Sequence, residues 1–412
     1  MYARKRKIKL NNETVLETPL LVPSYSSKGF HSINEIIQLT DHLIDSAALV
    51  SRFDIHYQQL SSIPSKPNII FLDSGGYEAS KEFETYKFGK SHFETLNWSE
   101  DYHQGVIRSD FPDTQNFVLI SYDHPNQRIC LENQIEKANN LFSSRKQFIR
   151  EILVKPEHQS PTINIENVIS HIDKLSAFDI LGFTEKELGL NTNERVMNLK
   201  LIRTSLDKFC PDMPIHIFGC LDPILTPLYY LFGADIFDGL SWLRLAFVDG
   251  LAIYQSNYSE LVFNGEVPDN DALCKIWYEN YWYLNSLESE MNRYSINHSI
   301  DCFTYYTFQP HTIVYAIPVV RVLGNTINRA KVGIVWHTTY TGSTLQGMKA
   351  SFGADIRGLK KPSSVWMDDA TYKDTSGRAT FTAKETAKIT AVLSQTGKTF
   401  QRINANGLRK FL

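Results

Sequence analysis

Short apolar runs recur along the first 240 residues, and stretches with helical spacing of apolar positions separate most of them. Each run is rich in Ile, Leu, Val or Phe, which is typical of a strand that is buried on both faces. The runs cover residues 18–23, 46–51, 68–73, 116–122, 151–155, 178–182, 214–219 and 235–240.

The intervening stretches predict amphipathic helices over residues 32–44, 127–143, 163–176 and 191–208, the last opening with Asn-Thr-Asn-Glu, a good helix start. Eight strands that alternate with helices predict a parallel α/β fold. We expect a closed (β/α)8 TIM barrel. A doubly wound open sheet is the second choice, because no Gly-x-Gly-x-x-Gly follows the first run.

Three further segments complete the expected organisation. Residues 74–115 are long for one βα connection, so they form either an active-site loop or a structural insertion. Aromatic-rich residues 251–320 predict a helix or two that close the barrel domain, which we place at 1–320. Residues 321–412 predict a separate α+β appendage, in which only 383–396 has a clear helical pattern.

Composition narrows the class of protein. Hydrophobic residues make up 42% and charged residues 21%, as in ordinary globular proteins. The five cysteines form no C-x-x-C pair, which indicates a reducing compartment. The basic start has no apolar stretch behind it, and no run is long enough to span a membrane. We therefore expect a cytoplasmic protein without a membrane partner.

Charge is distributed unevenly along the chain. The net charge is −3, yet residues 321–412 hold fifteen lysines and arginines against five acids. A basic end on an acidic body suggests a polyanionic partner, although a solvated surface explains the charge equally well.

Polar and glycine residues end several of the runs, and in a barrel the carboxyl ends of all strands meet at one mouth. Asp73, Asp123, Lys155 and Asp238 would converge there. Carboxylates on either side of a sugar carbon suit glycosyl transfer, since one attacks and another acts first as acid and then as base. A single aspartate at a strand end more commonly caps a helix, but three of them, together with glycines, favour a site.

Six segments, in order and over about residues 15–255, resemble the motifs of the tRNA-guanine transglycosylases. Residues 17–29 resemble the first barrel strand of that family, and the other five segments resemble its later strand ends. Those five are 73–78 (family D-S-G-G-F-Q), 120–123 (A-F-D), Gly182 with Glu187 (Gly-Gly-Leu and a later glutamate), 218–219 (a glycine strand end) and 234–244 (G-x-D-M-F-D-C-x-x-P-T-R).

The resemblance implies a role for each matched position. Asp238 would be the nucleophile that binds the sugar covalently, Asp73 the general acid/base, and Asp123 the reader of the guanine edge. The nucleic-acid contacts would be Lys28 and Arg244. The other base-binding residues implied are Ser74, Gly75, Tyr77, Lys155, Gly182, Glu187 and Gly219.

The sequence departs from the family pattern away from the two catalytic aspartates. The zinc motif C-x-C-x-x-C with a later histidine is missing, and the nearby candidates Cys274, His298 and Cys302 fit no standard zinc spacing. We therefore predict no structural zinc and no required cofactor. Glu78 replaces a glutamine, and Phe247 stands where an arginine is expected.

One branch of the superfamily, the DpdA-type proteins, exchanges guanine in DNA for a 7-deazaguanine such as preQ0. The missing zinc motif and the basic C-terminal module make the chain resemble that branch. We therefore expect a DNA guanine transglycosylase whose partners are DNA, a free preQ0-type base and, as an option, a protein that opens the duplex.

Three alternatives stay open. The first is the same exchange on tRNA, and the second is a non-catalytic nucleic-acid-binding subunit, which the presence of both catalytic aspartates disfavours. The third is an unrelated barrel enzyme acting on small sugars, which the ordered motifs disfavour.

Overall fold

The computed structural model describes residues 2–30, 32–80, 96–106, 115–125, 127–255, 257–258, 270–299 and 302–303. By compactness the chain divides into one unit of residues 1–248 and 252–298, and a second of 249–251 and 299–412. The predicted appendage 321–412, its boundary near 320 and the helix expected at 383–396 lie outside the described residues.

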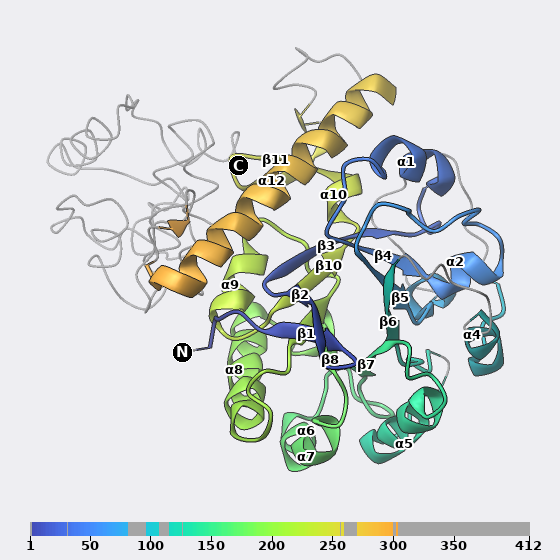
Figure 1. Cartoon of the computed structure of the whole chain (residues 1–412), viewed down its shortest axis with the longest axis vertical. Helices are drawn as coiled ribbons and strands as arrows, with labels where there is room; N and C mark the ends of the chain where they lie inside the picture. The colour runs from blue at the N-terminus through green and yellow to red at the C-terminus, as the bar shows by residue number, and fades with distance from the viewer. Residues whose placement is uncertain are drawn as a thin grey trace, which may run out of the picture. The chain divides into compact units, whose positions relative to one another are not determined.

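The first unit is a closed barrel of eight parallel strands, which confirms the predicted (β/α)8 architecture (Figure 1). Around the barrel the strands run in sequence order, and the last one pairs with the first. They are β3 (Leu20–Tyr25), β4 (Ala47–Ser51), β5 (Ile69–Asp73), β6 (Asn116–Ile120), β7 (Ile149–Val154), β8 (Ile180–Thr184), β9 (Ile215–Phe218) and β10 (Ile236–Gly239).

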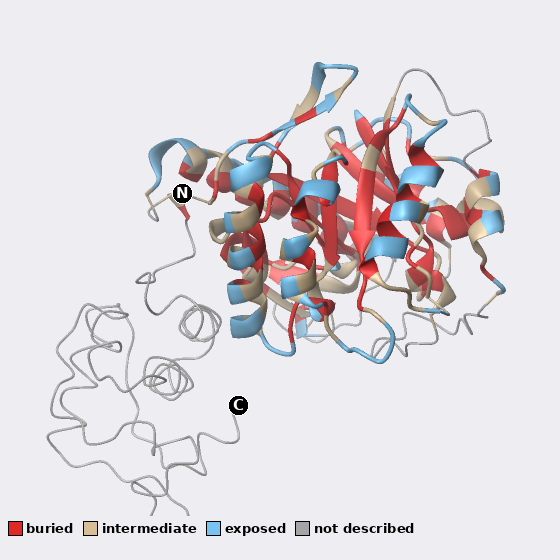
Figure 2. Ribbon diagram, turned by 90° about the horizontal axis from the view of Figure 1, so that it is seen from below, coloured by how far each residue is buried: buried red, intermediate tan, exposed pale blue. Residues whose placement is uncertain are grey.

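Helices surround the barrel, and the longer ones, such as α5 and α8, bury one face and expose the other (Figure 2). They are α1 (Ile33–Thr40), α2 (Arg52–His56), α3 (Gly76–Ala79), α4 (Glu100–Val106), α5 (Leu131–Phe142), α6 (Ile165–Ser170), α7 (Ile172–Leu175), η1 (Glu185–Glu187), α8 (Thr192–Phe209), α9 (Leu225–Leu231) and α10 (Ser241–Arg244). The single helix expected at 163–176 is divided into α6 and α7 at His171, whose φ of −109° and ψ of 15° leave the helical region.

A hairpin of β1 (Lys7–Leu10) and β2 (Glu13–Glu17) precedes the barrel, and the sequence pattern did not predict it. Its turn residues Asn11 and Asn12 have positive φ values of 51° and 68°, which asparagine tolerates well. Ile8 packs with Leu20 and other residues at the starts of the barrel strands. The hairpin therefore covers the amino end of the barrel, and the opposite end carries the predicted site.

A long helix, α12 (Asn270–Asn297), follows the barrel and matches the closing helix expected in this region. Asn280 fixes it to the end of the barrel, since its amide donates to the carbonyls of Trp242 at 2.6 Å and Leu245 at 2.7 Å. Leu245 lies in β11 (Leu245–Val248), which forms a small separate sheet with β12 (Leu251–Tyr254).

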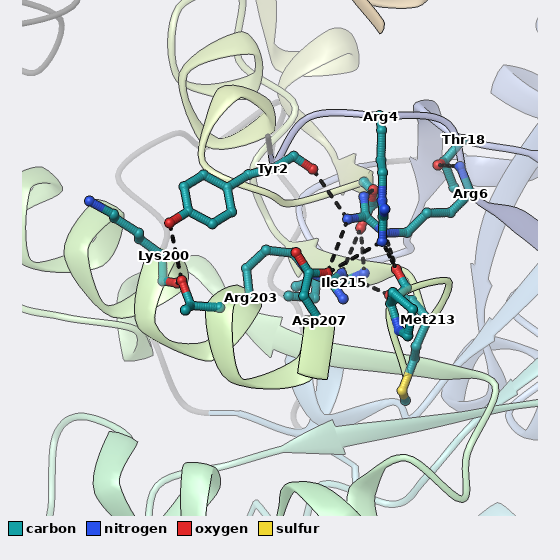
Figure 3. Close-up of polar contacts among 12 residues, drawn as sticks. Tyr2, Arg4, Arg6, Thr18, Lys200, Arg203, Asp207, Met213 and Ile215 are labelled. Carbon is teal, nitrogen blue, oxygen red and sulfur yellow. Dashed lines mark hydrogen bonds and ion pairs between the residues drawn. The ribbon is translucent and has the colours of Figure 1, made fainter. Parts of the chain in front are cut away.

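A buried ion network joins the segment before β1 to the start of β10 (Figure 3). Arg6 forms an ion pair with Asp235, and Arg203 Nη1 lies 3.6 Å from the same carboxylate. All three side chains are fully buried. Asp235 also accepts the backbone N–H of Ile215 at 2.9 Å, so one carboxylate holds the starts of β9 and β10 together.

Candidate active site

Asp238 lies on β10 near the carboxyl end of the barrel, and only 6% of the residue is exposed. Ser24 Oγ donates to its Oδ2 at 2.8 Å, and the backbone N–H of Gly219 donates to its Oδ1 at 3.0 Å. Gly219 has a φ of +75°, which favours glycine, and a Cβ there would meet no atom within 4 Å. The nucleophile expected from the sequence is therefore a hydrogen-bonded carboxylate beside open space.

Inside the barrel, a histidine lies next to Asp238, and a second carboxylate lies next to that histidine. His216 Nε2 lies 3.3 Å from Asp238 Oδ1, while His216 Nδ1 lies 2.8 Å from Glu151 Oε1. Both side chains are fully buried. Burial lowers the pKa of His216, but the neighbouring Glu151 and Asp238 carboxylates outweigh this effect and raise it to about 9.

Glu151 and His216 were not among the residues expected at the site, although both lie inside predicted strands. Gly182 on β8 makes room for them, because a Cβ there would come within 2.7 Å of Glu151 Oε1 and 2.6 Å of the Phe218 ring. Gly182 was expected to line the base pocket, and the structure places it against this buried pair. Ionisable residues in the middle of apolar strands were the signal that could have revealed the pair.

Asp73 ends β5, and its Oδ2 accepts the backbone N–H of Gly75 at 3.1 Å. Trp98 covers this turn by donating its indole N–H to the carbonyl of Ser74 at 2.9 Å. Burial raises the pKa of Asp73 to about 6, and the charges of Asp123 and Asp238 also raise it. Asp73 therefore shares the electrostatic environment of the other two carboxylates and can hold or release a proton near neutral pH.

Asp123 lies directly against the loop that carries Asp73. A Cβ at Gly76 would lie 1.9 Å from Asp123 Oδ2, so this carboxylate occupies the space that any side chain at 76 would need. Its other oxygen, Oδ1, is buried and accepts no hydrogen bond from the described residues. Burial raises the pKa of Asp123, and Lys155 and Arg128 act in the opposite direction. An acceptor without a donor in this position is suited to a ligand N–H group.

Lys155 and Glu187, both expected at the base, lie next to each other and are mostly buried. Lys155 Nζ lies 2.6 Å from Glu187 Oε2 and donates to Thr184 Oγ1 at 2.9 Å. Arg128 connects them to Asp123, since it donates to the Asp123 carbonyl at 2.7 Å and lies 3.4 Å from Glu187 Oε1. The sequence analysis did not single out Arg128.

Tyr77, expected to contact the base, is held by the two residues expected to contact nucleic acid. Arg244 donates to the Tyr77 hydroxyl at 2.8 Å and to the Lys28 carbonyl at 3.0 Å. The Lys28 ammonium lies 4.5 Å from the centre of the Tyr77 ring and donates to the carbonyls of Tyr77 and Ser80. Both cations therefore support the Tyr77 loop, and their contact with nucleic acid stays a prediction.

Glu78, which stands where the sequence resemblance would place a glutamine, is almost completely buried. Its carboxyl group accepts hydrogen bonds from the hydroxyls of Ser26 and Ser51. Burial raises its pKa to about 8, and the charges of Asp54 and Asp73 contribute. A glutamate that stays protonated at neutral pH is close in shape and hydrogen bonding to a glutamine.

The three candidate zinc ligands do not form a site among the described residues. Cys274 lies near the start of α12 and His298 just after its end. With 1.5 Å of rise per residue these positions are about 35 Å apart along the helix axis. No group of three potential metal ligands occurs in the part of the chain that the structure describes, and no helix there is both long and apolar enough to cross a membrane.

Comparisons with known proteins bear on the C-terminal part of the chain alone. Residues 292–410 match a family whose description is "Family of unknown function (DUF6267)". A search of curated proteins gives no significant match.

Proposed function

We propose that the chain is a transglycosylase that exchanges guanine in DNA for a 7-deazaguanine base of the preQ0 type. The observation that carries the proposal is the different environment of three carboxylates at the ends of β5, β6 and β10. Asp238 accepts two hydrogen bonds, Asp73 has a pKa raised to about 6, and Asp123 has a buried oxygen to which none of the described residues donates.

The first half of the proposed reaction breaks the bond between the sugar C1′ and guanine N9. Asp238 attacks C1′ and forms an ester with the sugar, while Asp73 gives its proton to the departing guanine. The raised pKa of Asp73 supports this role, because a group that titrates near the working pH is the most effective acid and base.

The second half reverses these steps with another base. The incoming 7-deazaguanine loses its N9 proton to Asp73 and attacks C1′, and Asp238 leaves as a carboxylate. Asp73 is then protonated again, so the cycle needs neither an oxidant nor ATP.

We assign recognition of the base to Asp123 and Lys155, which follow β6 and β7. Guanine and 7-deazaguanines present N–H donors at N1 and N2, which suit the buried Asp123 Oδ1. Lys155 at the end of the next strand supplies a cation beside the O6 acceptor in this arrangement. The base must leave the duplex to reach the site, at a cost of roughly a few kcal/mol.

The decisive experiment incubates the full chain with radiolabelled guanine or preQ0 and compares duplex DNA with bulk tRNA. We expect label in DNA alone, and none with Asp238→Asn, which keeps the side-chain size but removes the nucleophile. Label in tRNA alone would show that the substrate is tRNA and not DNA, while the proposed base-exchange chemistry would stand. Label in neither polymer, also when cell extract supplies partner proteins, would refute the proposed function.

A further inference from the structure

The buried pair Glu151 and His216 has no role in the reaction as described so far. His216 is enclosed on its ring faces and edge, since the Phe218 ring stacks on it with centroids 3.9 Å apart and Phe71 meets it edge-on at 5.5 Å. The titratable groups that face it are Glu151 from β7 and Asp238 from β10, and β8 presents Gly182. Nδ1 is hydrogen-bonded to Glu151 Oε1 at 2.8 Å, and Nε2 lies 3.3 Å from Asp238 Oδ1 but makes no hydrogen bond among the described residues, so one nitrogen lies near each carboxylate.

This placement determines which protonation state of the His216 ring is favoured. A neutral imidazole has one N–H, so one of its nitrogens would point a lone pair at a carboxylate oxygen. A doubly protonated ring avoids this repulsion on both sides, and the raised pKa of about 9 agrees with that state. Glu151 and His216 then form an ion pair without net charge, and its positively charged imidazolium lies beside Asp238.

The two oxygens of Asp238 consequently differ. Oδ1 lies 3.3 Å from His216 Nε2 and accepts the Gly219 N–H, while Oδ2 accepts the Ser24 hydroxyl and no other donor among the described residues. Each oxygen thus accepts one hydrogen bond, and His216 adds a second contact at Oδ1. Oδ2, the less restrained of the two, is therefore the oxygen assigned to attack C1′. A cation near Oδ1 also favours the ionised carboxylate over the ester, because the charge disappears when the ester forms.

We propose that His216, held by Glu151, is a positioning residue that fixes Asp238 through Oδ1 and stabilises its negative charge when the carboxylate leaves in the second displacement. This inference rests on the proposed function. It predicts that loss of the cation slows the breakdown of the covalent intermediate more than its formation, and that the intermediate accumulates.

The test uses the double variant His216→Phe with Glu151→Leu, beside the single variant His216→Phe. The double variant replaces a buried ion pair by apolar side chains, a change that proteins often tolerate without loss of stability, whereas the single variant leaves Glu151 unpaired. Single-turnover rates are measured separately for release of labelled guanine and for incorporation of labelled base. We expect incorporation to fall about 10²–10³-fold, the usual effect of removing a transition-state donor, and release to fall less.

Two further readouts separate positioning from packing. In wild-type protein the incorporation rate should decline above about pH 9, where His216 loses its proton, and the double variant should lack this decline. The ¹⁵N shifts of His216 should show two protonated nitrogens at pH 7, a measurement that needs no substrate. Release and incorporation that fall equally, or a neutral ring at pH 7, would overturn the inference. Wild-type protein that exchanges no base would instead overturn the proposed function, and the inference with it.

Discussion

Replacing Asp235 by alanine should destabilise the barrel strongly, although the residue lies at the end opposite the mouth. The change removes the buried carboxylate that Arg6 and Arg203 share, so the two buried guanidinium groups keep the partly exposed Asp207 in its place, and it removes the acceptor for the Ile215 N–H. Burial lowers the pKa of Arg203 to about 10, so it stays charged at neutral pH. Breaking a buried ion pair by removing one partner typically costs about 3–5 kcal/mol.

Asp207 provides the matched control in the same network. It lies 2.9 Å from Arg203 and 3.7 Å from Arg6, but 27% of its side chain is exposed, so water can replace it. Asp207→Ala should therefore cost about 1 kcal/mol, as expected for partly exposed pairs. The free energy of unfolding is measured by urea denaturation, followed through tryptophan fluorescence. Equal losses for the two variants would show that burial does not determine the strength of this network.

Three further predictions concern the mouth of the barrel. Because the pKa of Asp73 is about 6, the single-turnover rate of guanine release should fall tenfold per pH unit above pH 6. A rate that stays constant from pH 6 to 8 would exclude Asp73 as the acid. Asp123→Asn puts an amide where N–H donors of the base are expected. The KM for the free base should therefore rise about 10–100-fold, with little change in melting temperature. An unchanged KM would show that Asp123 does not bind the base. Glu78 has a folded pKa of about 8, raised above its usual 4.5, so its contribution to stability is complete below about pH 4.5 and is lost as the pH rises through 8. Glu78→Gln should therefore match the wild-type free energy of unfolding at pH 5 and exceed it at pH 9, and equal values at pH 9 would contradict the raised pKa.

The barrel could be predicted from the sequence because its strands are buried on both faces and read as continuous apolar runs. All eight predicted runs correspond to barrel strands within a few residues. The β1–β2 hairpin escaped prediction because β2 is mostly exposed and polar, so its pattern resembles that of a loop. The break at His171 depends on one residue's backbone angles, which periodicity does not report.

Most of the site residues expected from the sequence lie at or near the ends of strands, whereas Glu151 and His216 lie within strands and were not expected. Asp73 and Asp123 stand at strand ends, where polar residues draw attention. Glu151 and His216 are 65 residues apart, and each lies within a strand of mainly apolar residues, so the closed barrel is what brings them into contact. The contacts of Lys28 and Arg244 with Tyr77 were also missed, because they join three segments that are distant in sequence.

Two glycines of the barrel have a consequence for how this protein can evolve. A side chain at Gly76 would overlap the Asp123 carboxylate, and one at Gly182 would overlap Glu151. Neither glycine can be replaced while its acid remains. Loss of the Asp123 carboxylate frees the space beside Gly76, whereas a side chain at Gly182 also needs Phe218 to move, because the Phe218 ring lies 2.6 Å from the Cβ position. Gly76 should therefore change together with Asp123 among relatives, and Gly182 with both Glu151 and Phe218. Joint changes of this kind would identify lineages that have lost the proposed base reader or the buried ion pair separately.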